Sequence, residues 1–216
     1  MKWIAHRGDH QNAVENSMKA FKNAIENHYD GIECDIRLTS DDAFIVYHDD
    51  TFKRLNGMKK KVRSLSLKEA TDLTYLEDPS EHILDLNTLL SWMHQKKRTM
   101  LIEIKDILNQ KQAQSLFNVL KTYDIDYVIM SFHIQNVRLM SQLNTMWLIS
   151  KVTKKVIKNA RSHQINHLGC DVNHMTPTML DDIIHQGFLV SLWTVNDRQH
   201  LWSTYPLTFL TTDLKQ

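Results

Sequence analysis

The stretch Gly31-Ile32-Glu33-Cys34-Asp35-Ile36-Arg37 alternates apolar and charged side chains, and Leu101-Ile102-Glu103-Ile104-Lys105 repeats the pattern. Side chains of a strand alternate between its two faces, so each stretch has one apolar face and one charged face. Strands of a parallel barrel are normally apolar on both faces, because helices cover the outside and side chains fill the inside. We therefore predict two strands whose apolar faces meet helices and whose charged faces share the interior of a barrel.

Short runs rich in β-branched and aromatic residues recur along the chain and are predicted to be strands: residues 3–7, 31–39, 99–105, 127–132, 146–152, 167–173, 188–195 and 207–212. Amphipathic patterns between them are predicted to be helices: residues 15–28, 111–123, 134–143, 154–163, 177–186 and 198–205. Strands separated by helices indicate a parallel sheet with right-handed crossovers. Eight predicted strands favour an α/β fold of the (β/α)8, or TIM-barrel, type over a doubly wound sheet.

Helix caps agree with these assignments. Asn16 or Ser17 can cap the first helix, and Thr176 precedes Pro177 at a typical first turn. The connection over residues 40–98 is far longer than an ordinary strand-to-helix loop. It contains another strand-like run, at 43–47, and two short helical patterns, at 67–73 and 86–95. We expect residues 1–216 to form a single barrel domain with a small insertion over approximately 49–85.

Bulk composition limits the possible functions. A net charge of +1 provides no overall field for nucleic acid or a membrane, so we expect a small-molecule partner and no nucleic acid. No apolar run approaches the roughly 18–20 residues of a membrane span. The start of the chain lacks the apolar segment of a signal peptide. Cys34 and Cys170 show no metal or redox spacing, and buried free thiols are favoured over a disulfide. A cytoplasmic protein is the resulting expectation, and the sequence predicts no oligomeric state.

The charged strand faces predict a metal site. Burying Glu33, Asp35 and Glu103 together costs several kcal/mol unless positive charge joins them. Arg37 and Lys105 can neutralise part of that charge, but a hard divalent cation neutralises it better. Ligands that are all oxygen suit Mg²⁺ or Ca²⁺ rather than zinc. The alternative is a buried salt-bridge network without metal.

Two histidines lie where a barrel places its catalytic groups, at the carboxyl ends of strands. His6 and Arg7 end the first strand, and His48 ends the strand-like run after the second. Such a pair can cleave a phosphodiester, one imidazole accepting the proton of the attacking oxygen and the other protonating the leaving alkoxide. Arg7 and Lys105 would bind the non-bridging phosphate oxygens.

Six short motifs occur in the following order: His6-Arg7-Gly8, Glu15-Asn16-Ser17, Glu33-x-Asp35, His48-Asp49, Glu103-x-Lys105 and Trp193-Thr194-Val195-Asn196. Together with the closing Thr212-Asp213, this set resembles the glycerophosphodiester phosphodiesterase family. The resemblance implies a TIM barrel, a metal site of Glu33, Asp35 and Glu103, and an acid/base pair of His6 and His48. It also implies that Arg7 and Lys105 bind phosphate and that Trp193 lines the substrate pocket.

Members of that family hydrolyse glycerophosphodiesters to an alcohol and glycerol 3-phosphate, so the resemblance implies a phosphoric diester hydrolase. The sequence departs from the usual pattern at Val14, at Leu86-Asn87 and at Lys215. None of these touches a proposed catalytic position.

Several alternatives stay open at this point. A lysophospholipase-D-like barrel shares the same histidines and carboxylates, and a non-catalytic barrel that binds phosphorylated metabolites is a third possibility. Trp193 could be core packing. Positions near the expected rim, which could contact substrate, are His10, His133 and His174. The run of lysines from 59 to 61 fits a solvated loop or a basic rim.

Overall fold

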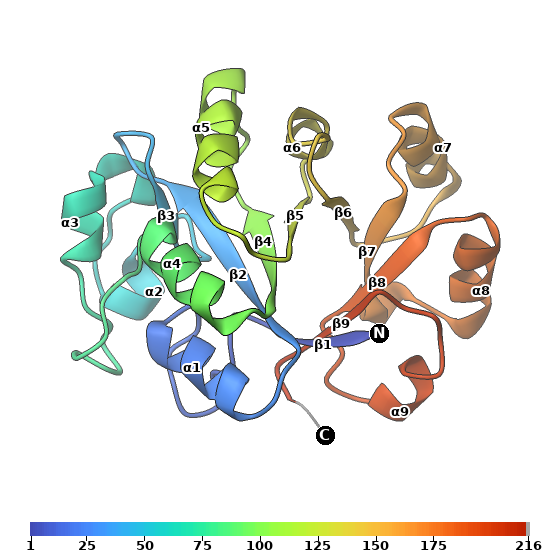
Figure 1. The fold of residues 1–216 in the computed structure, drawn as a ribbon, viewed down its shortest axis with the longest axis horizontal. Coiled ribbons are helices and arrows are strands. Elements are labelled where there is room, and N and C mark those ends of the chain that lie inside the picture. Colours follow the sequence, from blue (N-terminus) through green and yellow to red (C-terminus); the bar gives the residue numbers. More distant parts are fainter. Residues whose placement is uncertain (215–216) are drawn as a thin grey trace.

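The computed structural model describes residues 1–214; Lys215, at which the sequence departs from the family pattern, lies outside them. The described chain forms a (β/α)8 barrel (Figure 1). Its strands are β1 (Lys2–Ala5), β2 (Gly31–Leu38), β3 (Phe44–Val46), β4 (Thr99–Ile104), β5 (Tyr127–Ser131), β6 (Thr145–Ile149), β7 (His167–Asp171), β8 (Leu189–Trp193) and β9 (Phe209–Thr212). Neighbours follow the order β1-β9-β8-β7-β6-β5-β4-β2-β3, and β1 also pairs with β2. This last pairing closes the sheet and rules out the doubly wound alternative.

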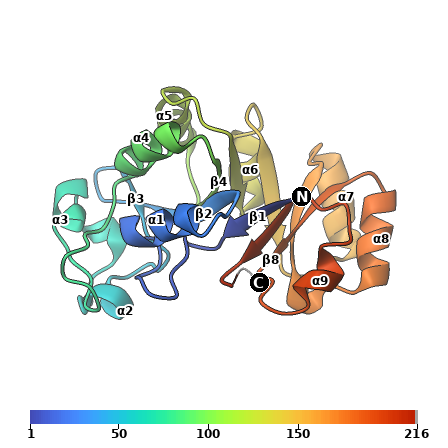
Figure 2. The same cartoon turned by 60° about the horizontal axis from the view of Figure 1, so that its bottom comes forward.

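The α-helices are α1 (Met18–Glu26), α2 (Lys53–Asn56), α3 (Leu67–Thr71), α4 (Leu86–Lys96), α5 (Gln110–Lys121), α6 (Ile134–Leu139), α7 (Lys154–Ser162), α8 (Pro177–His185) and α9 (Gln199–Trp202). Figures 1 and 2 show most of them around the outside of the barrel. No helix in the described part of the chain is long and apolar enough to cross a membrane.

The two faces of the strands bury different residues, as the alternating pattern predicts. The apolar faces of β2 and β4 carry Ile32, Cys34, Ile36 and Ile104, which pack into a core with residues of α1, α4 and α5. A separate cluster fills part of the barrel interior: Ile4, Leu101, Val128, Met130, Met146, Leu148 and Phe209. The charged faces of β2 and β4 are therefore free to gather at the carboxyl end of the barrel.

The first helix begins later than the sequence pattern suggests. Ser17 is its N-cap, with a side chain that accepts a hydrogen bond from the Ala20 amide at 3.1 Å. Asn16 stands outside the helix with a positive φ of 58°. Its side chain hydrogen-bonds Asp35, donating to the carboxylate at 2.9 Å and accepting from the Asp35 amide at 3.2 Å. Because this backbone conformation is not helical, the predicted start at residue 15 is wrong. At α8 the predicted Thr176 cap and the Pro177 first turn are both confirmed.

The long connection after β2 begins with β3, which pairs antiparallel to β2. It continues through α2, a 3₁₀ turn (Val62–Ser64) and α3, which lie together to one side of the barrel (Figures 1 and 2). This segment has a core of its own, made by Val14, Ile45, Tyr47, Phe52, Val62, Leu65, Ala70, Tyr75 and Ile83. The three lysines at 59–61 are exposed, as a solvated loop requires.

Both cysteines are buried free thiols, in agreement with the sequence expectation. Cys34 lies on β2 and Cys170 on β7, on opposite sides of the closed sheet order. The alternative of a disulfide between them is thereby excluded.

Candidate active site

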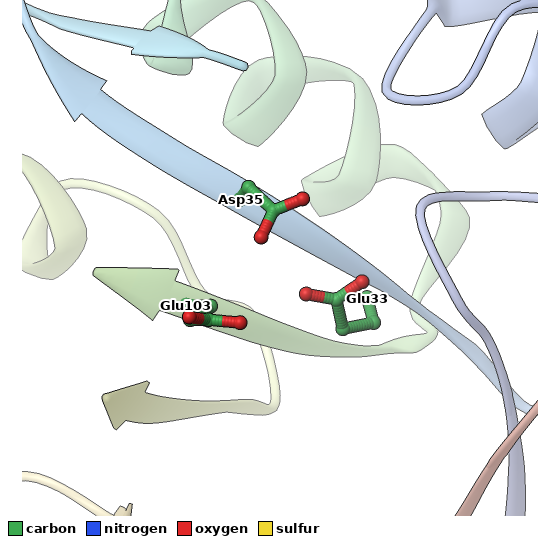
Figure 3. Close-up of side chains that lie close together, drawn as sticks. All are labelled: Glu33, Asp35 and Glu103. Atoms are coloured by element: carbon green, nitrogen blue, oxygen red, sulfur yellow. The ribbon is translucent and has the colours of Figure 1, made fainter. Parts of the chain in front are cut away.

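Three carboxylates converge at the carboxyl-terminal part of the barrel interior (Figure 3). Glu33 and Asp35 project from β2 and Glu103 from β4, where Asp35 and Glu103 are direct partners across the two strands. One oxygen from each of the three lies within 4.8 Å of the others. They are 1%, 1% and 8% exposed, so water hardly compensates their charge. The sequence prediction that these side chains gather around one point is confirmed.

Two cations flank this carboxylate cluster. The ammonium Nζ of Lys105 lies 2.8 Å from Glu103 and 3.4 Å from Asp35. Arg7 places its Nε 3.2 Å from Asp35, and its backbone N–H donates to Glu33 at 2.9 Å. Positive charge therefore reaches the cluster from two different strand ends.

The sequence also suggested that Arg37 neutralises the cluster, and this is wrong. Its guanidinium pairs with Asp106 at 3.0 Å and its Nε donates to the backbone carbonyl of His48 at 2.7 Å. Arg37 is close to the end of β2, beyond the carboxylates, so its long side chain reaches the next loop instead. Arg7 takes the predicted place beside Asp35.

The protonation preferences of the three acids differ. Burial, together with the charges of Asp35 and Glu103, holds the pKa of Glu33 well above its usual range. Burial and the charge of Asp35 also raise the pKa of Glu103, to about 7. Burial acts in the same direction on Asp35, but Lys105 and Arg7 outweigh it and leave its pKa below the ordinary value. The cluster thus holds more acid than its two cations neutralise, and that excess is what a divalent cation would satisfy.

A tight turn aims Arg7 at the cluster. Arg7 and Gly8 both have positive φ, at 54° and 79°, directly after β1. A Cβ on Gly8 would lie 2.7 Å from the backbone carbon of Ala20, so only glycine fits this close approach to α1. The turn directs the Arg7 N–H toward Glu33 and the guanidinium toward Asp35 and Glu15. A non-glycine residue held in this region of backbone space stores strain that its surroundings must offset.

His6 is oriented by a carboxylate from the other end of the chain. Its Nδ1 lies 2.7 Å from Oδ1 of Asp213. The second oxygen of Asp213 accepts a hydrogen bond from the side chain of Asn196 at 2.6 Å. His10 also approaches the same carboxylate, with Nε2 at 3.8 Å. The pKa of Asp213 is about 2, because hydrogen bonds from His6 and Asn196 outweigh the effect of burial.

His48 has the same arrangement with a neighbour in sequence. Its Nδ1 lies 2.8 Å from Oδ1 of Asp49. The preceding Tyr47 donates its backbone N–H to the carbonyl of Asp35, which sets His48 beside the carboxylate cluster. Burial lowers the pKa of His48, and the nearby Asp35 offsets this only in part. In both histidines the Nδ1–H faces a carboxylate, so Nε2 is the nitrogen left to exchange a proton.

Trp193, at the end of β8, packs against the cluster that fills the barrel interior. Its ring meets Phe132 edge-on, with centroids 5.4 Å apart. Its indole Nε1 is buried without a hydrogen-bond partner among residues 1–214. A buried indole N–H normally finds an acceptor, so this one is ready to donate to a bound molecule.

Sequence reasoning assigned no part in the site to several residues that the structure brings there: Glu15, Asn16, Asp49, Arg54, Asn196 and Asp213. All but Arg54 stand inside the motifs on which the resemblance rests, so their positions were visible. Most of their contacts were not, because a sequence motif does not say which side chains meet, and several partners are distant in sequence, as for Asn16 with Asp35, Arg54 with Glu15, and Asp213 with His6.

Comparison with known proteins identifies the family. The sequence profile of the "Glycerophosphoryl diester phosphodiesterase family" matches residues 6–213, nearly the whole chain. The chain belongs to the glycerophosphoryl diester phosphodiesterase family. It is therefore an enzyme, a phosphoric diester hydrolase.

Individual relatives agree with this family assignment. A glycerophosphodiester phosphodiesterase of Caldanaerobacter subterraneus subsp. tengcongensis is 27% identical over 215 residues, covering 95% of this chain and 75% of that protein. A human lysophospholipase D is 35% identical over 78 residues, which cover 36% of this chain and 22% of that protein. Among solved structures, an Oleispira antarctica phosphodiesterase in complex with sn-glycerol-3-phosphate has a TM-score of 0.88 at 20% identity. That match covers 99% of this chain and 93% of the other, and it establishes the shared fold.

In this glycerophosphoryl diester phosphodiesterase family member, the structure gathers the sequence-predicted residues at one end of the barrel. His6, Arg7, His48 and Lys105 follow strand ends, and the three acids lie beside them on β2 and β4.

Proposed function

We propose that this enzyme hydrolyses glycerophosphodiesters to an alcohol and glycerol 3-phosphate, with His6 and His48 as the acid/base pair. The observation that carries the proposal is the matched pair of imidazoles, each with Nδ1 held by a carboxylate, at the strand ends beside the buried acids. This arrangement fixes the tautomer of each ring and presents its Nε2. A general acid and a general base at fixed positions are what phosphodiester cleavage near neutral pH requires.

In the proposed reaction one imidazole accepts the proton of the attacking oxygen through Nε2, and the other gives a proton to the leaving alkoxide. Arg7 and Lys105 stabilise the negative charge that develops on the phosphoryl oxygens. Both cations are 19% or less exposed at the side chain, so water weakens their attraction to an anion only a little. Trp193 would line the pocket and offer its unpartnered indole N–H to the substrate.

Glu33, Asp35 and Glu103 would hold a divalent cation, Mg²⁺ or Ca²⁺. The fit rests on three buried carboxylate oxygens within 4.8 Å of one another, with more acid than the flanking Arg7 and Lys105 neutralise. Oxygen donors alone match the preference of these hard cations. When bound, such an ion supplies positive charge that stabilises the phosphoryl group as its negative charge grows.

On this proposal residues 1–216 act as one catalytic barrel, with residues 49–85 as an insertion beside its mouth. The substrate is a small molecule. A glycerol 3-phosphate product is seen in the Oleispira antarctica structure of the same fold, which supports the proposed product.

A second candidate activity is lysophospholipase-D-like cleavage of lysophospholipids. Two large apolar side chains stand exposed just beyond strand ends: Ile107 after β4, 58% exposed, and Phe132 after β5, 40% exposed. Phe132 also packs on Trp193, so an acyl chain could continue from the proposed pocket over this surface. A non-catalytic barrel has no such support, because the family is one of enzymes and the histidines and carboxylates are all present.

A substrate panel tests the proposal. Glycerophosphocholine, -ethanolamine, -glycerol and -inositol are assayed beside lysophosphatidylcholine, with Mg²⁺, with Ca²⁺ and with chelator. We expect release of glycerol 3-phosphate from at least one glycerophosphodiester. Turnover of lysophosphatidylcholine alone would favour the second candidate, and turnover of none would refute both.

A further inference from the structure

Arg54, a residue of the insertion, contacts the carboxylates that hydrogen-bond His48 and Arg7. It lies on α2 and binds two carboxylates at once, each through both oxygens. Its Nε and Nη2 donate to Asp49 at 2.7 and 3.0 Å. Its Nη1 and Nη2 donate to Glu15 at 3.0 and 2.7 Å. Four of the five N–H groups of the guanidinium are used in this way, an arrangement that a lysine could not reproduce.

Each of those carboxylates also contacts a residue with a proposed role in the reaction. Asp49 holds Nδ1 of His48 at 2.8 Å. Glu15 accepts a hydrogen bond from Nη1 of Arg7 at 2.9 Å, and Arg7 in turn lies 3.2 Å from Asp35. One guanidinium thus stands behind both the proposed acid/base residue and the proposed phosphate ligand.

The side chain of Arg54 is 47% exposed, but the short helix that carries it is anchored by buried neighbours. The residue before α2, Phe52, is fully buried, and its ring packs on Tyr47 with centroids 5.2 Å apart. The last residue of α2, Asn56, accepts a hydrogen bond from the hydroxyl of Tyr47 at 2.8 Å. Tyr47 immediately precedes His48, so the same packing that seats α2 also seats the histidine.

Glu15 needs its cations. Its side chain is only 13% exposed, and burial alone would raise its pKa. The hydrogen bonds from Arg54 and the charge of Arg7 reverse this and leave the pKa of Glu15 below its usual value. Without Arg54, Arg7 becomes the one remaining cation hydrogen-bonded to Glu15 in the described chain. Glu15 then attracts the Arg7 guanidinium more strongly, in competition with Asp35.

We propose that Arg54 is a positioning residue, through which the insertion fixes the orientation of His48 and Arg7 for catalysis. The inference rests on the proposed roles of those two residues. On this inference the insertion affects the rate of turnover through Arg54, although Arg54 does not itself contact the substrate.

The first test uses Arg54→Ala, with Arg63→Ala as the matched control. Arg63 is also an insertion arginine, 45% exposed, and it pairs with Asp42 away from the proposed site. On a glycerophosphodiester that the wild type hydrolyses, we expect Arg54→Ala to lower kcat about tenfold, as loss of an outer partner of a catalytic group does. KM should change less than kcat, since the other proposed substrate contacts, Lys105 and Trp193, stay in place. The control should keep wild-type kinetics.

Chemical rescue separates positioning from a general loss of structure. The half-exposed site left by Arg54→Ala is open to free guanidinium, so millimolar guanidinium should restore part of kcat, while equal concentrations of NaCl and urea should not. Arg54→Lys should recover less than the added guanidinium, because the fork is lost. Wild-type kcat in Arg54→Ala, an equal loss in the control, or no rescue in a folded variant would overturn the inference.

The tautomer of His48 can be measured without an activity assay, so it tests the positioning role of Arg54 separately from the proposed function. In nitrogen NMR of the imidazoles, assigned with His48→Gln, His48 should carry its proton on Nδ1 in the wild type. Arg54→Ala should shift that tautomer population, and Arg63→Ala should not. An unchanged His48 would refute the positioning role even if no substrate were found. Failure of the wild type on every substrate would refute the proposed function alone.

Discussion

His6 and Asp213 are 207 positions apart in the chain, yet Nδ1 of the imidazole lies 2.7 Å from Oδ1 of the carboxylate. Closure of the barrel explains the contact, because β1 pairs with β9 and the His6 amide donates to the carbonyl of Thr212 at 2.9 Å. The residue directly after β9 therefore completes the environment of the residue directly after β1. The side chain of Asn196 donates to the other oxygen of Asp213 and accepts from its backbone N–H, so Asp213 is held by both His6 and Asn196.

Replacing this carboxylate should weaken catalysis without removing a group that touches the substrate. In Asp213→Asn the side chain no longer imposes an Nδ1–H tautomer on His6, and we expect kcat to fall about 10- to 100-fold. Metal affinity, measured by calorimetry, should stay unchanged. Asp126→Asn is the control, since that carboxylate pairs with Lys2 at the amino end of the strands. Normal kcat for Asp213→Asn would show that His6 needs no such partner.

Loss of either histidine should stop most turnover. His6→Gln and His48→Gln should each reduce kcat by about 10²-fold or more, because each removes one proton-transfer step. The double variant should be little worse than either single one, since the two act as a unit. His185→Gln, at an exposed histidine on α8, controls for the substitution itself. A mild effect in a folded His6 or His48 variant would mean that the roles are misassigned.

Metal removal should abolish activity and reveal strain in the carboxylate cluster. We expect exhaustive chelation to stop turnover and added Mg²⁺ or Ca²⁺ to restore it. Glu33→Gln removes a buried acid, so it should raise the melting temperature in chelator, where like charges repel. With metal the same variant should melt below the wild type, because it loses binding energy that stabilises the folded state. Undiminished turnover after chelation would contradict the metal assignment.

Lys105 has two possible roles that Lys105→Met distinguishes. As a salt-bridge partner of Glu103 and Asp35, its loss should lower stability without metal and be rescued when metal binds. As a phosphate ligand, its loss should lower kcat and kcat/KM together at saturating metal, by about 2–4 kcal/mol of transition-state stabilisation. We expect the second result. Near-normal kinetics with a metal-rescued melting curve would assign Lys105 to the scaffold and leave Arg7 as the phosphate ligand.

A buried histidine at the other end of the barrel should control acid stability. Burial lowers the pKa of His167 from 6.5 to about 4, and its Nε2 lies 2.8 Å from the hydroxyl of Ser191. Between those two pKa values the unfolded chain binds a proton that the folded protein does not, so stability falls as pH falls from about 6.5 to 4. The full effect is about 3 kcal/mol.

Denaturant unfolding at several pH values measures this effect. His167→Gln should flatten the dependence of unfolding free energy on pH across that window, whereas His163→Gln, at an exposed position, should retain it. An equal slope for His167→Gln and the wild type would show that His167 is not the group responsible.

The amino-acid sequence alone determined which residues share a face. A strand has a period of two, so Glu33, Asp35 and Glu103 had to oppose the isoleucines beside them, and the helices had to cover the apolar side. The order of strands and helices made a closed barrel the favoured fold. These features follow from local geometry, which a single sequence expresses directly.

Tertiary structure decided which charges meet. The sequence placed Arg37 on the same face as the carboxylates, yet its side chain reaches Asp106, and Arg7 from the turn after β1 takes its place. Asp213 and Arg54 gained their partners in the same way. Such contacts depend on barrel closure, register and the positive-φ turn at Arg7, which bring together atoms that local periodicity does not relate. Long charged side chains reach several possible partners, and only the folded chain determines which one lies within bonding distance.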